Sequence, residues 1–235
     1  MSGIEVCAIP GTMCDERLWS LLTPHIDANI HIRHLDITAE ETEEGMLDAI
    51  AAAVKPKVHL LGFSMGGYLA MRYALSNAEN ISSLTVISYS ARGLDAREIA
   101  SRKNMIQWLS HNRYDGMSEM QLSLLMDNES LNNPEIADTI LAMDKDLGGK
   151  VMLAQLKSTS ERPSLMNEIS RLKIPVLIAG GENDLKVDVA ELREMNTRIN
   201  NSQLHIVPQC GHMLPLEKPE LLAEQLNRFY LSIAP

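Results

Sequence analysis

Short apolar and β-branched runs alternate along this chain with segments whose apolar residues recur at helical spacing. Six of the runs are expected to be strands: 4–9, 30–35, 58–61, 84–89, 174–181 and 203–207. Helices are expected at 16–22, 40–54, 69–75 and 219–231. This alternation predicts an α/β fold of about six mostly parallel strands with helices on both faces.

The segment 91–171 breaks the alternation, because it is rich in methionine and polar residues and contains no convincing strand. We expect it to be a helical lid inserted over the carboxyl ends of the strands, where open α/β sheets bind their ligands. No linker, repeat or low-complexity tract divides the rest. Residues 1–235 are therefore expected to form a single domain that contains this lid.

Composition narrows the function without identifying it. The chain has 235 residues, of which 45% are hydrophobic, and a net charge of −10, which disfavours a nucleic-acid binder. Cys7, Cys14 and Cys210 cannot all pair and show no CxxC spacing. Residues 1–5 show no signal peptide, and no apolar run is long enough for a membrane span. We expect a reduced, cytoplasmic protein without metal or cofactor, in which His31 and His34 are surface residues rather than metal ligands.

The most informative motif is Gly62-Phe63-Ser64-Met65-Gly66, which lies between an apolar run and a helical segment. A strand, a tight turn and a helix are the context in which this Gly-x-Ser-x-Gly pattern forms a nucleophile elbow. The serine hydroxyl would project from the carboxyl edge of the sheet. Gly62 and Gly66 would permit the close approach of strand and helix. We therefore expect Ser64 to be a nucleophile.

A serine needs a base to take its proton, and that base needs an acceptor to orient it. His212 lies in a glycine-bearing loop after the strand that ends at Val207, and Asp184 lies in the loop after Ala179. In a parallel sheet, both loops would lie at the same edge as Ser64. The sequence predicts a triad of Ser64, Asp184 and His212, with Glu182 and Asp188 as alternatives for the acid.

An acyl-transfer site also needs two donors for the oxyanion. One would be the amide of Met65, directly after the nucleophile. The other would come from the loop Pro10-Gly11-Thr12-Met13, where we favour the Thr12 amide over that of Met13. The alternative is that Pro10-Gly11 is simply a tight turn.

With these motifs the chain resembles the α/β-hydrolase superfamily, and is most similar to small intracellular esterases and thioesterases with a helical lid. The resemblance rests on Ile9-Pro10-Gly11 with Trp19, on residues 62–67, on Gly180–Asp184 and on Cys210–Pro219. It covers nearly the whole chain outside the lid. Pro10 stands where the family usually has histidine, and Val187 occupies the neighbourhood of a usual proline. The chain begins at the strand that feeds the oxyanion loop, so the family's first hairpin is not expected.

The resemblance implies hydrolysis of a carboxylic ester or thioester of a small to medium acyl group through an acyl-enzyme. Met13, Trp108 and Met213 are the residues expected to bind substrate. The lid carries Trp108 and six methionines whose flexible thioethers suit an adaptable apolar pocket: Met105, Met117, Met120, Met126, Met143 and Met152. Several of those methionines could instead simply pack the lid onto the body.

Basic residues between Arg92 and Arg113 could attract an anionic acyl carrier, either a carrier protein or coenzyme A. This arrangement is similar to that of the carrier-protein methyl esterase of biotin synthesis. The alternative is a solvated helix face.

Two other functions remain open. The same triad could cleave C–C bonds or act as a lyase, as some relatives in menaquinone and ring-cleavage pathways do. The chain could also be a catalytically silent ligand receptor on the same fold, although an intact set of Ser64, Asp184 and His212 argues against this.

Overall fold

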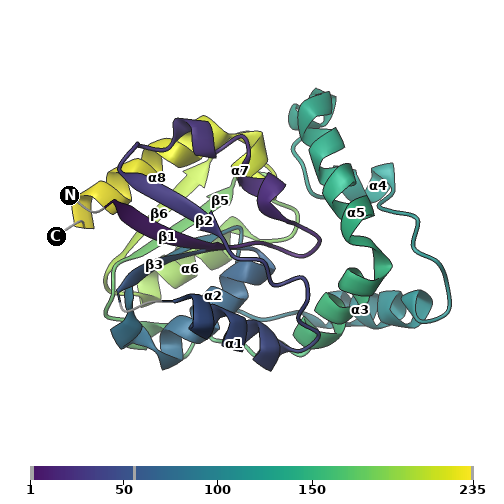
Figure 1. The fold of residues 1–235 in the computed structure, drawn as a ribbon, viewed down its shortest axis with the longest axis horizontal. Helices are drawn as coiled ribbons and strands as arrows, with labels where there is room; N and C mark the ends of the chain where they lie inside the picture. Colours follow the sequence, from purple (N-terminus) through teal and green to yellow (C-terminus); the bar gives the residue numbers. More distant parts are fainter. Residues whose placement is uncertain (1–2, 55–56, 234–235) are drawn as a thin grey trace.

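The computed structural model describes residues 3–54 and 57–233 of the expected 1–235 domain. Met1 and Ser2, which begin the segment in which no signal peptide is expected, lie outside the described residues. The core is a six-stranded, fully parallel sheet with the order β2-β1-β3-β4-β5-β6 (Figure 1). The strands are β1 (Ile4–Ile9), β2 (Ile30–His34), β3 (Val58–Phe63), β4 (Ile81–Ile87), β5 (Val176–Gly181) and β6 (Ser202–Val207). The predicted fold class is confirmed.

Burial along the strands follows their position in the sheet. Every residue of the central strands β3 and β5 is buried, as expected for strands covered on both faces. The edge strand β2 alternates between buried Ile30 and exposed His31, which matches its alternating sequence. The hydrophobic pattern therefore distinguishes the edge strand β2 from the interior strands β3 and β5.

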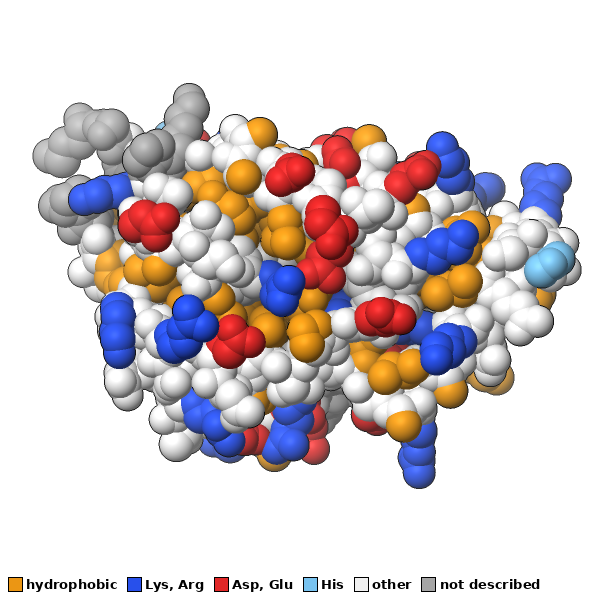
Figure 2. Space-filling model, turned by 90° about the horizontal axis from the view of Figure 1, so that it is seen from below, with side chains coloured by type: hydrophobic (Ala, Val, Ile, Leu, Met, Phe, Trp, Pro, Cys, Tyr) orange, Lys and Arg blue, Asp and Glu red, His pale blue; other side chains and the backbone are white. Residues whose placement is uncertain are grey.

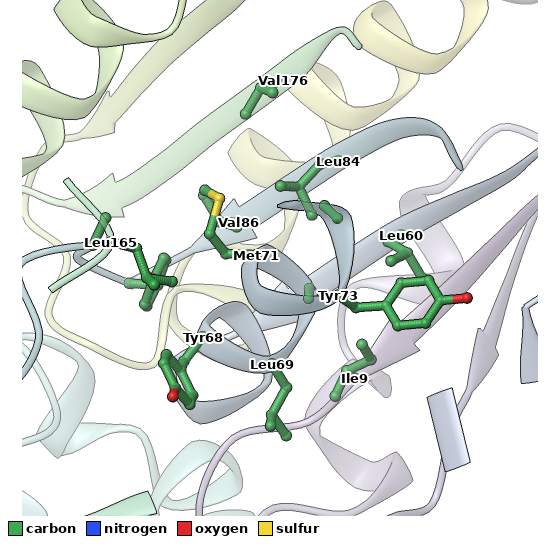
Figure 3. Packing of buried hydrophobic residues seen from close by; sticks show 14 of the residues in the cluster. Ile9, Leu60, Tyr68, Leu69, Met71, Tyr73, Leu84, Val86, Leu165 and Val176 are labelled. Atoms are coloured by element: carbon green, nitrogen blue, oxygen red, sulfur yellow. The ribbon is translucent and has the colours of Figure 1, made fainter. Parts of the chain in front are cut away.

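Helices cover both faces of the sheet. On one face lie α1 (Glu43–Ala53), α2 (Met65–Ser76) and α6 (Val189–Arg198), and on the other lie α7 (Leu214–Glu217) and α8 (Pro219–Ile233) (Figure 1). Around α2, apolar side chains such as Leu69 and Met71 pack against residues of β1, β3 and β4, and Figure 3 shows Leu69 beside Ile9 and Met71 beside Val86. Burial of this kind contributes about 1.5–3 kcal/mol for each large side chain. No helix among the described residues has the length and apolar character to cross a bilayer.

One local expectation was wrong in form, and one helix was not expected at all. The predicted helix 16–22 is instead a pair of short 3₁₀ turns, Glu16–Trp19 and Thr23–His25. The Asp15 side chain caps the first turn by accepting from the Arg17 amide at 2.9 Å, and the proline of the second turn prevents one continuous helix. Helix α6 was not expected, because it is strongly polar and buries only Leu192 and Met195.

The segment 91–171, called the helical insertion below, contains α3 (Ala96–Leu109), α4 (Glu119–Ser123) and α5 (Pro134–Thr159), with 3₁₀ turns at Ser130–Asn132 and Ile169–Arg171. None of its described residues is in a strand. Gly148 interrupts α5 with φ 70° and ψ 179°, a conformation essentially reserved for glycine, and so divides the helix into two arms. The insertion lies beside the sheet, on the opposite side of the molecule from the chain termini (Figure 1).

The elbow glycines allow β1, β3 and α2 to approach closely. A Cβ on Gly66 would lie 2.2 Å from the Ile9 carbonyl oxygen, and one on Gly62 would lie 2.3 Å from the Gly66 carbonyl oxygen. Both neighbours are backbone atoms and cannot move without displacing a strand or a helix. The geometric reason given above for these two glycines is therefore correct.

We predict that Gly66→Ala lowers the free energy of unfolding by at least ~3 kcal/mol, since the clash is with backbone. Gly45→Ala is the matched control. Gly45 lies within α1, where alanine favours the helix by about 1 kcal/mol, and its Cβ would meet only the flexible end of the Glu40 side chain before the helix. Urea denaturation of both variants measures the difference. Equal stability of the two variants would contradict the close packing of the elbow.

Candidate active site

Ser64 lies between β3 and α2 in a strained backbone conformation. Its φ of 50° and ψ of −109° fall outside the regions that a non-glycine residue normally adopts. Strain of this kind costs about 1–3 kcal/mol and persists only where the surrounding structure enforces it. The hydrogen bond from the Ser64 amide to the Ile87 carbonyl and the buried start of α2 supply that support.

His212 connects Ser64 to Asp184. Its Nε2 lies 3.0 Å from the Ser64 Oγ, and its Nδ1 lies 2.8 Å from Asp184 Oδ2. The side chains of His212 and Asp184 are 7% and 1% exposed, so bulk water does not compete for their contact. The other carboxylate oxygen of Asp184 accepts from the amides of Lys186 and Val187 at 2.7 and 3.1 Å. The three residues expected from sequence thus lie in one hydrogen-bonded row.

The alternative acids lie elsewhere. Asp188 caps α6 by accepting from the Ala190 amide at 2.7 Å, and Glu182 is exposed. Neither side chain has a hydrogen bond to His212. The geometry therefore favours Asp184 as the partner of the imidazole.

The loop that carries His212 is fixed by contacts that the sequence reading missed. The Ser88 hydroxyl donates to the His212 carbonyl at 2.8 Å, and the His212 amide donates to the Leu125 carbonyl of the insertion at 2.9 Å. Buried Glu217 accepts from the amides of Gly211 and Met213, and from that of Asp127, at 2.7–3.1 Å. Burial raises the pKa of the Glu217 carboxyl, and these amide donors oppose that rise. Only its position five residues after His212 could have indicated such a role.

The loop after β1, residues 10–13, is the predicted oxyanion loop and lies directly against Ser64. A Cβ on Gly11 would be 2.7 Å from the Phe63 ring and 3.3 Å from the Ser64 Cβ. The Met13 amide is already occupied, because it donates to Gln155 Oε1 of α5 at 2.9 Å. Among the described residues, the Thr12 and Met65 amides have no acceptor. These two amides are therefore the available donors beside Ser64.

The expected substrate-binding residues have different surroundings. Met13 is buried with Met152 and Leu156 in an apolar cluster that also includes residues of α3. Met213 is 2% exposed and packs in the core beneath α8, next to His212. Trp108 is 45% exposed on α3 and does not belong to the cluster around Met13. Of the three, Met13 has the surroundings that best suit an acyl pocket.

The cysteines and the paired histidines lack the features of a second site. Burial raises the pKa of Cys14 to about 12 and also raises that of Cys210, so neither thiol is a thiolate nucleophile at neutral pH. His34 is partly buried rather than a plain surface residue, and its Nδ1 accepts from the Trp19 indole at 3.2 Å. In the described ranges, no three His, Cys, Asp or Glu residues are grouped as metal ligands.

The basic segment Arg92–Arg113 is largely neutralised by ion pairs. Its ion pairs join Arg92 to Glu191 and Glu194, Arg102 to Glu98, and Arg113 to Asp115. Figure 2 shows acidic and basic side chains interspersed over the face seen from below. The structure therefore gives little support to a strongly basic docking surface.

Comparison with known proteins agrees with the fold. A model of the alpha/beta hydrolase fold family matches residues 38–219, most of the chain. The chain belongs to this family.

Individual relatives differ in activity. A Bacillus subtilis protein named "Putative 2-succinyl-6-hydroxy-2,4-cyclohexadiene-1-carboxylate synthase" is 26% identical over 75% of this chain and 67% of its own length. Monoacylglycerol lipase ABHD6 of Bos taurus is 21% identical over 97% of this chain and 76% of its own. A thermophilic esterase from Thermogutta terrifontis superposes with a TM-score of 0.88 at 22% identity, over 100% of this chain and 92% of its own. The family includes lipases and esterases, and the chain is a hydrolase-superfamily member.

We predict that Glu217→Ala destabilises the protein by about 3 kcal/mol or more, because it leaves three backbone amides without their acceptor. Turnover should also fall at least ~10-fold, since the His212 loop loses its internal anchor. The control is Glu220→Ala, whose side chain is 79% exposed and should change stability by no more than about 0.5 kcal/mol. Denaturation and steady-state rates measure both effects; a Glu217→Ala protein as stable as the control would refute the anchoring role.

Proposed function

We propose that this chain is a serine hydrolase that cleaves a carboxylic ester or thioester of a small to medium acyl group. Ser64 Oγ attacks the carbonyl carbon while His212 Nε2 takes its proton. Asp184 holds the imidazole and stabilises its charged form. The His212 proton then passes to the leaving group, and water releases the acyl group from Ser64 by the reverse sequence. The continuous Ser64–His212–Asp184 hydrogen-bonded row is the observation that carries this proposal.

The oxyanion donors in this proposal are the amides of Met65 and Thr12. Three observations support this choice: Met65 directly follows Ser64, Gly11 before Thr12 lies against Ser64, and the Met13 amide already donates to Gln155. Helix α2 begins at Met65, so its positive amino end adds to the field at the developing charge. Loss of one such donor costs about 10²–10³ in rate in serine hydrolases, which is the scale expected for this pair.

We further propose that segment 91–171 is the lid of this single-domain enzyme, and that Met13 contributes to the acyl pocket below it. The apolar cluster that joins Met13 to α3 and α5 supports this role. Trp108 is largely exposed, so in this proposal it could contact substrate only at the outer edge of the pocket. Met213 is buried in the core next to His212, so it could contact substrate only beside that residue. A carrier protein or coenzyme A remains a weaker proposal, because the basic residues are mostly paired.

The first alternative is a C–C bond hydrolase or lyase that uses the same three residues. The Bacillus subtilis relative is named as a putative synthase rather than an esterase, which is the specific reason to retain this alternative. Such an enzyme would not cleave simple esters. A panel of acyl esters and acyl thioesters of graded length therefore separates this alternative from the main proposal.

The second alternative is a silent receptor. Incubation with a fluorophosphonate followed by intact mass measurement distinguishes it, because only an activated serine forms the adduct. Absence of an adduct at Ser64 would favour the receptor. The cytoplasmic location expected from sequence remains a prediction.

We predict that Ser64→Ala lowers kcat for a 4-nitrophenyl acyl ester by at least ~10³-fold, because no other group in the row can form the acyl-enzyme. The matched control is Ser82→Ala, a partly exposed serine of β4 far along the strand from the elbow, which should retain most activity. Both variants should keep the melting temperature of the parent within a few degrees. Wild-type turnover by purified Ser64→Ala would refute the proposed mechanism.

A further inference from the structure

Arg162, directly after α5, carries a positive charge into the molecule without an acidic partner. Its Nε donates to the Thr159 carbonyl at 3.0 Å, and its guanidinium carbon lies 5.0 Å from the centre of the Tyr68 ring. Its Nη2 is sealed from solvent and has no hydrogen-bond partner among the described residues, although the residue as a whole is partly exposed. Within the described ranges, no carboxylate lies within 4.0 Å of it. The neighbouring Arg102 is instead paired with Glu98 at 2.8 Å.

An unpaired buried charge is expensive. A buried ion normally has a counter-ion or a full set of hydrogen bonds, because the interior does not solvate it as water does. Burial, followed by the like charge of Arg102, lowers the pKa of Arg162 to about 10. The cation–π contact with the Tyr68 ring offsets only part of the free energy lost by removing the guanidinium from water. Arg162 thus has the environment of a group that receives an anion.

Two further buried donors have no partner. Tyr89, packed against Gly67 of α2, is 4% exposed and its hydroxyl is unpaired; the charge of Arg162 acts on it. Gln155 is 1% exposed, and its Oε1 accepts from the Met13 amide, so its Nε2 is the unpaired atom. Because the Met13 N–H requires an acceptor, this amide orientation is fixed. Unpaired groups that can all donate favour an anionic ligand.

These groups lie between the oxyanion loop and the first turns of α2. Gln155, Thr159 and Arg162 follow one another at spacings of four and three residues, so they share one side of α5 and the turn after it. Gln155 touches the oxyanion loop through Met13. Arg162 covers the ring of Tyr68 in the first turns of α2, and the Tyr68 hydroxyl donates to the Glu43 carboxylate of α1 at 3.0 Å. The donors therefore lie between the loop after β1, which Gln155 contacts, and the first turns of α2, which Tyr89 and Arg162 contact.

We propose that Arg162, with the Tyr89 hydroxyl and the Gln155 amide, binds a carboxylate on the acyl part of the substrate. The inference rests on the proposed function, since it places this group on the acyl chain joined to Ser64. Arg162 has no ion pair among the described residues, whereas Arg102 is paired with Glu98, whose charge also acts on Arg162. A single unpaired cation matches a monoanion better than a phosphate dianion. A planar guanidinium also suits a carboxylate in a two-point contact. The preferred substrates are therefore half-esters of dicarboxylic acids.

The test measures binding separately from turnover. Monomethyl esters of succinate, glutarate and adipate are each compared with the dimethyl ester of the same acid, which has the same chain but no charge. Calorimetric titration of Ser64→Ala protein is expected to give at least ~10-fold tighter binding of the monoester at the best chain length. Arg162→Gln in the same background should remove the preference. Arg228→Gln, an exposed arginine paired with Glu224 on α8, should retain it.

Equal binding of both esters at every chain length would overturn the inference, as would a preference that survives Arg162→Gln. Arg162→Lys keeps the charge and should retain part of the preference, which separates loss of binding from loss of folding. Hydrolysis of the same esters by the wild-type protein tests the proposed function independently. Binding preference without Ser64-dependent turnover would leave the anion site standing and refute the hydrolase.

Tyr89→Phe distinguishes a binding role from a structural one. Removal of a buried, unpaired hydroxyl relieves a desolvation cost, so the variant should melt at an equal or higher temperature. Its preference for the monoester should nevertheless fall about 3-fold or more. A lower melting temperature with an unchanged preference would show that the hydroxyl serves the fold alone and would remove Tyr89 from the site.

Discussion

The two hydrogen bonds of the His212 ring are the interaction on which the candidate site depends. Each ring nitrogen reaches a side chain from a different strand exit, Ser64 after β3 and Asp184 after β5. They can do so because β3, β4, β5 and β6 are parallel and paired in order, which brings their carboxyl ends to one edge. A change in the direction of any of these strands would separate the three groups. Sheet topology is thus the source of the site's geometry.

The helical insertion is hydrogen-bonded directly to the loops that form the candidate site. Its Leu125 carbonyl accepts from the His212 amide, and its Asp127 carboxylate accepts from the Asn183 side chain of the acid loop at 2.7 Å. On the other side, Gln155 holds the oxyanion loop through Met13. Movements of these parts of the insertion would therefore displace the loops that contain His212, Asp184 and Met13.

Much of this arrangement could be predicted from sequence, because its signals are local. The elbow motif, the apolar run before Ala179 and the glycine-bearing loop of His212 each mark a strand exit without reference to the rest of the chain. The short helices were harder, since Asp15 and Pro24 direct a local choice between α and 3₁₀ turns that periodicity does not resolve. Strongly polar α6 carries almost no apolar pattern.

The parts that could not be predicted depend on how the insertion packs. Nothing in the neighbourhood of Gln155 or Glu217 indicates that one reaches the oxyanion loop and the other gathers three amides. Arg162 lies outside the basic segment Arg92–Arg113. It is unusual only in the folded protein, where its guanidinium is largely removed from water and forms no ion pair with a carboxylate of the described residues. Trp108 was expected at the pocket from its residue type, but α3 presents it largely to solvent. Such roles arise from contacts between distant segments, which a single sequence does not reveal.

The central claim is that Asp184 acts through His212 on Ser64, and its most direct test is the kcat of Asp184→Asn beside that of Asp188→Asn. The first change leaves the packing nearly intact but removes the charge that holds and stabilises the imidazole, whereas Asp188 caps α6. We predict a fall of at least ~10³-fold in kcat for Asp184→Asn and less than about 3-fold for Asp188→Asn. Equal rates for the two variants would contradict the account.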